Sequence, residues 1–170
     1  MAASKIKSLV LGLSLFAFSG PASAQQMVRA DAVAAGAIWA QKLSVSETIS
    51  YCQAYVAPIV KDQLAVVLEN WTNVNRKYLA ITLKIRLEMI KSVIRANGQD
   101  AAADFVASME EKDKLAQAGM RAVLDQNPVG EREDKCYGII VAINEGVFDI
   151  ASALPDDAKH LDARAPVMGW

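Results

Sequence analysis

The sequence predicts an all-α protein: a helical bundle of four to five helices with one long central helix, stapled by one disulfide. Apolar residues after residue 24 recur at spacings of three and four, and no segment there shows the sustained alternation of a half-buried strand. In addition, Cys52 and Cys136 both fall on apolar stripes of predicted helices. The chain length that remains after residue 24 suits one compact domain, expected over residues 25–154.

The first 24 residues have the features of a secretory signal peptide. Lys5 and Lys7 provide a positive start, residues 9–18 form a short apolar core, and residues 22–24 are the small residues that precede a cleavage site. The apolar core is too short to cross a bilayer as a stable helix. The sequence therefore predicts cleavage after Ala24 and a periplasmic or secreted mature protein.

Two helices are expected before residue 58. The alanine-rich segment Met27–Leu43 favours a helix with a thin apolar face. Ser44 and Glu47 have the spacing of a capping box, which predicts that a second helix begins there. Its apolar stripe consists of Val45, Ile49, Cys52, Val56 and Ile59. Pro58 should break this helix because proline lacks the backbone donor and clashes with the preceding turn.

The long central helix is expected from Ile59 to Ala96, with Asn97-Gly98 as its stop signal. A straight helix of this length would extend about 57 Å. Its heptad seam consists of Val60, Leu64, Val67, Trp71, Val74, Tyr78, Ile81 and Ile85. The sequence leaves open whether this seam packs within one chain or between two copies.

Two further helices and a tail follow. Asp100 can cap a helix that continues to about Gln126, and a last helix is expected over residues 131–153. The stripe of the last helix consists of Cys136, Ile140, Ile143, Val147, Ile150 and Leu154. Beyond Pro155 the periodicity fails, so residues 155–170 are expected to be a polar, mobile tail.

A disulfide between Cys52 and Cys136 is favoured over a metal or redox pair. Exported proteins form disulfides, redox cysteines usually lie close together in sequence, and a zinc site needs more ligands than this chain offers. The bond also selects a topology. A four-helix bundle split near Asn73 would hold the two cysteines too far apart, whereas a reversal of the chain near Pro58 would bring them together.

Charge is small overall and unevenly distributed. The formal net charge of −1 is not that of a general nucleic-acid binder, and no apolar run after the leader could span a membrane. Residues 74–97 contain six basic residues and one acidic residue, whereas residues 99–134 contain nine acidic and four basic residues. Neighbouring helices could simply complement each other in charge. The functional alternative is a partner-binding face that meets an acidic partner or an anionic lipid surface, formed by Lys77, Lys84, Lys91 and Arg95.

Catalytic, metal and cofactor motifs are not found in the sequence. His160, the only histidine, is expected to be exposed in the tail, and the acidic pairs at residues 110–111 and 156–157 are expected to be solvated. Three aromatic residues near the Pro58 break could line a cavity between helices, although such residues usually fill a core. These candidate cavity-wall residues are Tyr55, Trp71 and Tyr78.

These features predict a non-enzymatic exported protein that binds another envelope or exported protein. Envelope accessories, chaperones and immunity proteins belong to this class, and the stretch of residues 136–138 resembles the last group over a few residues, which assigns no family. The alternative is a carrier of a small ligand or lipid. No cofactor and no metal is expected in either case.

Overall fold

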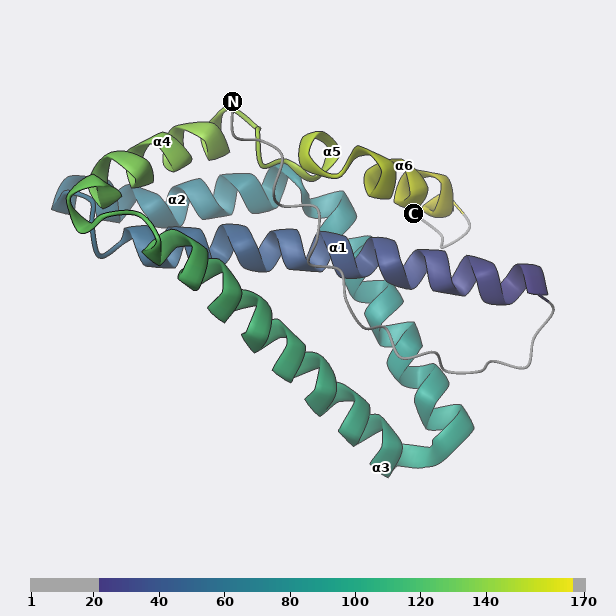
Figure 1. The fold of residues 1–170 in the computed structure, drawn as a ribbon. Coiled ribbons are helices and arrows are strands. Elements are labelled where there is room, and N and C mark those ends of the chain that lie inside the picture. The colour runs from purple at the N-terminus through teal and green to yellow at the C-terminus, as the bar shows by residue number, and fades with distance from the viewer. Residues whose placement is uncertain (1–21, 167–170) are drawn as a thin grey trace.

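The computed structural model describes residues 22–166 of the chain (Figure 1). The predicted signal peptide therefore lies outside the described residues, except for its last three positions. Residues 22–166 contain helices and no strand, and Cys52 is bonded to Cys136. This confirms the all-α class, the disulfide and a long central helix.

The first helix, α1, runs without a break from Ala22 to Cys52, so the predicted start of a new helix at Ser44 is wrong. Ile38, Val45 and Ile49 are all buried, which shows that both halves of α1 present one continuous face to the core. Glu47 does not cap this helix, because its carboxylate forms an ion pair with Arg121 at 2.6 Å. Glu47, which has the spacing of a capping-box residue in the sequence, therefore forms a tertiary contact instead.

Pro58 begins α2, which extends to Val74, and the chain reverses between α1 and α2 as predicted (Figure 1). A proline is tolerated at the first helical position because that backbone donor would have no partner within the helix. The reversal brings the Cα atoms of Cys52 and Cys136 to 5.4 Å, and both cysteine side chains are buried. The alternative bundle, in which one helix would run from Ser44 to a split near Asn73, is therefore excluded.

The predicted Ile59–Ala96 helix is interrupted at Asn75, where α2 ends and α3 (Arg76–Asp125) begins. The heptad seam still packs within the chain, with Leu64, Val67, Trp71, Ile81 and Ile85 buried. Val74 is the exception, since the bend leaves 67% of it exposed. The long central helix of the bundle is thus α3 and begins at Arg76.

Gly98 divides α3 into a first arm (residues 76–97) and a second arm (residues 99–125). Its backbone angles, φ 87° and ψ 179°, are not helical and lie in a region that glycine adopts without steric cost. Figure 1 shows the two arms meeting at a corner that projects away from α1. The predicted stop at Asn97-Gly98 is therefore a sharp corner.

The last predicted helix is divided as well. After a 3-10 turn at Val129–Glu131, α4 runs from Arg132 to Asn144, and α5 is a short helix at Ile150–Ala153. Gly146 ends α4 with φ 76°, and the N–H groups of Gly146 and Val147 donate to the carbonyls of Ile143 and Ala142, which is a Schellman arrangement. The expected stripe is broken there, and Val147 is 57% exposed.

The segment after Pro155 is a helix, α6 (Pro155–Arg164), although the sequence predicted a polar, mobile tail over residues 155–170. Ala158, Leu161 and Ala165 are buried, and α6 contacts α1, α3 and α5. Among residues 155–166 only these three are buried, too few to produce a recognisable period. Ion pairs described below supply the remaining contacts.

Candidate functional site

A pocket of about 260 Å³ lies between α1 and the two arms of α3. The first arm supplies Leu83, Leu87 and Ile90, and α1 supplies Trp39. The remaining lining residues are Arg86 from the first arm and Val106, Met109 and Glu110 from the second arm. Leu83 is 48% exposed and Leu87 is 55% exposed, so this apolar wall is open to solvent.

Helical spacing explains why one wall is apolar. Leu83, Leu87 and Ile90 follow one another at steps of four and three, which places their side chains on one side of the first arm. The corner at Gly98 then brings the second arm back, so that Val106 and Met109 face this stripe across the pocket. A single straight helix would have left both stripes on the surface without a facing wall.

Two lining residues of the pocket, Trp39 and Arg86, form a cluster with Asp113. The indole N–H of Trp39 donates to Oδ2 of Asp113 at 2.8 Å, and the guanidinium of Arg86 pairs with the same oxygen at 3.1 Å. Arg86 also lies over the Trp39 ring, 4.3 Å from its centroid. The cluster joins α1 to both arms, so it holds the three walls in fixed relation.

The predicted partner-binding face is brought together only in part. Lys77 pairs with Asp162 of α6 at 2.5 Å, so it helps to attach α6. Lys91 is exposed and pairs with Glu88 at 2.9 Å, which lowers the pKa of the Glu88 carboxyl, while Arg95 is exposed near the corner. Lys84, Lys91 and Arg95 therefore form a basic row beside the pocket, without Lys77.

One ion pair at the pocket fits the simpler interpretation, in which neighbouring helices complement each other in charge. The Arg86–Asp113 pair joins the basic first arm to the more acidic second arm, and both side chains are largely buried. Glu110 and Glu111 remain exposed, as do Asp100 and Asp104. The second arm therefore presents acidic groups to solvent, and Glu110 is the one that lines the pocket.

The three candidate cavity-wall residues form hydrogen bonds with separate segments of the chain. Trp71 is buried, and its indole N–H donates to the carbonyl of Phe148 at 3.0 Å. The hydroxyl of Tyr55 accepts from Arg132 at 2.8 Å, and that of Tyr78 lies 3.3 Å from the carboxylate of Asp162. These bonds lead to three separate segments: the turn after α4, α6 and α4 itself. A cavity wall shared by the three residues stays a prediction.

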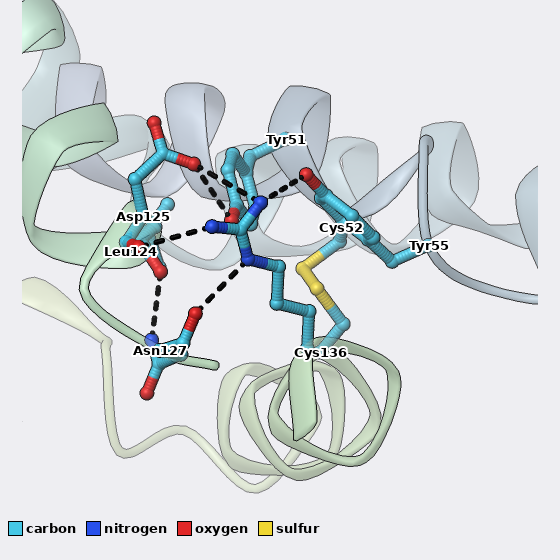
Figure 2. The surroundings of a disulfide bond; sticks show 8 residues. Tyr51, Cys52, Tyr55, Leu124, Asp125, Asn127 and Cys136 are labelled. Carbon is cyan, nitrogen blue, oxygen red and sulfur yellow. Dashed lines mark hydrogen bonds and ion pairs between the residues drawn. A yellow bond between two sulfur atoms is a disulfide. The ribbon is translucent and has the colours of Figure 1, made fainter. Parts of the chain in front are cut away.

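Polar groups surround the disulfide (Figure 2). The Tyr51 hydroxyl donates to Oδ1 of Asp125 at 3.0 Å, and the guanidinium of Arg132 donates to the backbone carbonyls of Asp125 and Asn127. Burial, together with hydrogen bonds to Tyr55 and Asp125, raises the pKa of Tyr51 to about 12. These contacts fasten the end of the second arm to the two helices that the disulfide joins, so we assign them a structural role.

His160 was expected to be exposed, but it is half-buried and bonded to Asp31 of α1. Its Nε2 lies 2.8 Å from Oδ1 of Asp31, and the guanidinium of Arg164 donates to both oxygens of the same carboxylate at 3.0 Å. Asp31 is itself buried. The sequence contains no signal for this cluster, because its members lie 129 and 133 positions apart.

The acidic pairs have different environments. Glu110 and Glu111 are exposed as predicted, but Asp157 is half-buried. Burial and, to a smaller extent, the negative charge of the nearby Asp156 raise the pKa of the Asp157 carboxyl. Within residues 22–166, no group of three or more acidic, histidine or cysteine residues is arranged to hold a metal ion. In the same residues, every helix is too short or too polar to cross a membrane.

Comparison with known proteins gave no match to a protein-family model, a curated protein or a solved structure, so the function is inferred from the geometry of the structure. The pocket itself was missed in the sequence because its walls come from three separate segments. The sequence shows the helical spacing of Leu83, Leu87 and Ile90, but it does not show that Leu83 and Leu87 are exposed.

Proposed function

We propose that this chain is an exported, non-enzymatic helical protein that acts by binding another protein through the pocket between the arms of α3. The observation that carries the proposal is the apolar wall of that pocket, where Leu83 and Leu87 are about half exposed at the centre of a recess. Apolar side chains exposed together in this way are typical of interaction surfaces. The disulfide supports export, because such bonds persist in oxidising compartments.

The size of the pocket favours a protein side chain over a small-molecule ligand. Pockets for small ligands usually enclose about 300–1,000 Å³ and cover most of the ligand surface. The present pocket has about 260 Å³ and an open wall, which fits one bulky apolar side chain of a partner. Protein interfaces commonly depend on such an anchor residue surrounded by polar contacts.

The charges beside the pocket support a protein partner as well. Lys84, Lys91 and Arg95 lie beside the apolar wall on the first arm, and Glu110 lines the pocket from the second arm. Charges at the edge of an apolar centre accelerate association and fix orientation more than they add affinity. The occupant we propose is therefore a segment of another exported protein with one anchor side chain and charged neighbours.

The test is to capture the partner with the tagged full-length chain in cells that export this chain. Two variants are compared, each at an apolar residue that is about half exposed. Leu87→Glu places a carboxylate in the pocket, whereas Val66→Glu places one on α2, where Val66 is 53% exposed and outside the pocket. We expect one stoichiometric partner to be captured by the unchanged chain and by Val66→Glu, and to be lost with Leu87→Glu. Equal capture by the two variants would exclude the pocket as the binding site.

A further inference from the structure

A single residue separates the two arms of α3. Gly98 has φ 87° and ψ 179°, whereas the residues of α3 on either side of it are helical. Nothing beyond its chain neighbours lies within 4 Å of the place that a Cβ on Gly98 would take, and residues 95–100 are all exposed. The corner therefore depends on the backbone angles of one glycine and on contacts that the arms make elsewhere. With helical angles at Gly98, the 50 residues of α3 would form one straight helix of about 75 Å.

The corner divides the chain into two parts that pack against each other (Figure 1). Residues 22–97 contain α1, α2 and the first arm, and residues 99–166 contain the second arm, α4, α5 and α6. Because the following contacts each join one part to the other, a second copy of the chain offers the same partner groups. These contacts are Trp39–Asp113, Glu47–Arg121, Tyr51–Asp125, Cys52–Cys136, Trp71–Phe148, Asn75–Ile150 and Asp31–Arg164.

We propose that Gly98 is a hinge at which two copies of this chain exchange residues 99–166. In the exchanged dimer, α3 is one straight helix, and the second arm, α4, α5 and α6 of each copy pack on α1, α2 and the first arm of the other copy. Domain exchange of this kind reproduces the contacts of the monomer, so the free-energy difference is confined to association and to the hinge. The exchange does not depend on the binding partner proposed above.

The disulfide fixes whichever arrangement is present when it forms. Cys52 lies before the hinge and Cys136 lies after it, so a bond within one copy ties the two parts together and prevents exchange. In the exchanged dimer, Cys136 of each copy pairs with Cys52 of the other copy. Each bond forms by two exchange steps with oxidised glutathione, in which two cysteine thiols become one disulfide and two reduced glutathione molecules are released. Cys52–Cys136 bonds between copies therefore report the exchange.

Gly98→Ala should favour the exchanged dimer. The backbone angles of Gly98 lie in a region that is essentially restricted to glycine, so alanine is strained at the corner and unstrained in a straight helix. We expect this strain to favour the straight form about tenfold for each chain and the dimer about hundredfold, because both hinges are relieved. Gly119→Ala is the matched control, since Gly119 lies within the second arm with open space around its missing Cβ.

The test is refolding of the reduced chain, purified from cells that export it, in a glutathione buffer at a series of protein concentrations. Equal amounts of unlabelled and isotope-labelled chain are mixed while unfolded, and the disulfide-bonded peptides are identified by mass spectrometry. Exchange produces Cys52–Cys136 pairs with one labelled and one unlabelled peptide, and a covalent dimer on a non-reducing gel. We expect these mixed pairs to increase with protein concentration and to be at least about tenfold more abundant in Gly98→Ala than in Gly119→Ala.

The pattern of pairing separates exchange from incorrect oxidation. An exchanged dimer contains Cys52–Cys136 bonds between copies, and it keeps the helical content of the monomer by circular dichroism. Bonds of Cys52 to Cys52 that are as frequent as mixed Cys52–Cys136 pairs would overturn the proposal. Equal yields of mixed pairs in Gly98→Ala and Gly119→Ala would overturn it as well. If Gly98→Ala does not refold, the unchanged chain decides, because a lack of mixed pairs at the highest protein concentration contradicts the exchange.

Discussion

The side-chain oxygen of Asn75 accepts a hydrogen bond from the backbone N–H of Ile150 at 2.7 Å, across 75 positions of sequence. The amide nitrogen of Asn75 donates to the carbonyl of Trp71 at 2.8 Å and to Oδ1 of Asp149 at 3.1 Å. Asn75 is 1% exposed and marks the bend between α2 and α3. One buried side chain therefore joins this bend to the start of α5.

Replacing Asn75 with alanine should destabilise the fold by about 2–4 kcal/mol, because a buried N–H and a carboxylate lose their partner. Urea unfolding measures the change. Asn73→Ala is the matched control, since Asn73 is exposed two positions earlier and should change stability by less than about 0.5 kcal/mol. Similar values for the two variants would show that the Asn75 contacts are not important for stability.

Two glycines of the same region should respond to alanine in opposite directions. Gly146 has φ 76°, and a Cβ there would lie 2.9 Å from Oδ2 of Asp149, so Gly146→Ala should destabilise by about 1–2 kcal/mol. Gly138 lies within α4 with no atom near its missing Cβ, so Gly138→Ala should stabilise by about 1 kcal/mol. Thermal unfolding of both variants tests the assignment, and a stabilising Gly146→Ala would contradict the backbone described for that turn.

The attachment of α6 should depend on Asp31. Asp31→Asn removes the charge that His160 and Arg164 contact, and we expect amide hydrogen exchange within residues 155–164 to accelerate and stability to fall by about 1–3 kcal/mol. Asp162→Asn breaks the exposed contact with Lys77 and should cost less than about 1 kcal/mol. Unchanged exchange in α6 after Asp31→Asn would show that apolar packing alone holds this helix.

Stability should fall in alkaline solution as Tyr51 ionises. Its folded-state pKa of about 12 is above the ordinary value of 10.0, so the stabilisation is fully present below pH 10 and is lost as the pH rises toward 12. A shift of this size corresponds to at most about 2–3 kcal/mol. Unfolding measured from pH 8 to 12 should be less pH-dependent in Tyr51→Phe, and an identical pH profile would assign the loss to other groups.

Local chemistry along the chain was enough to predict several features. The spacing of apolar residues predicted helices, Pro58 predicted a break and Gly98 predicted the end of a helix, because proline restricts the backbone and glycine extends its range wherever they occur. The pairing of Cys52 with Cys136 followed from two cysteines on inward stripes. Each of these inferences depends on residues within a few positions of one another, or on a count that leaves a single pairing.

Only the tertiary structure decided four features of this protein. They are the bend at Asn75, the continuity of α1 through Ser44, the helix α6 and the pocket. At the bend, the side-chain amide of Asn75 forms hydrogen bonds with Asp149 and Ile150. Glu47 forms an ion pair with Arg121 and does not cap a helix at Ser44. The pocket is formed by α1 and both arms of α3, which the hydrogen bond between Trp39 and Asp113 joins across 74 positions. Contacts at such separations depend on how the helices pack, and helical periodicity specifies only which face of each helix is buried.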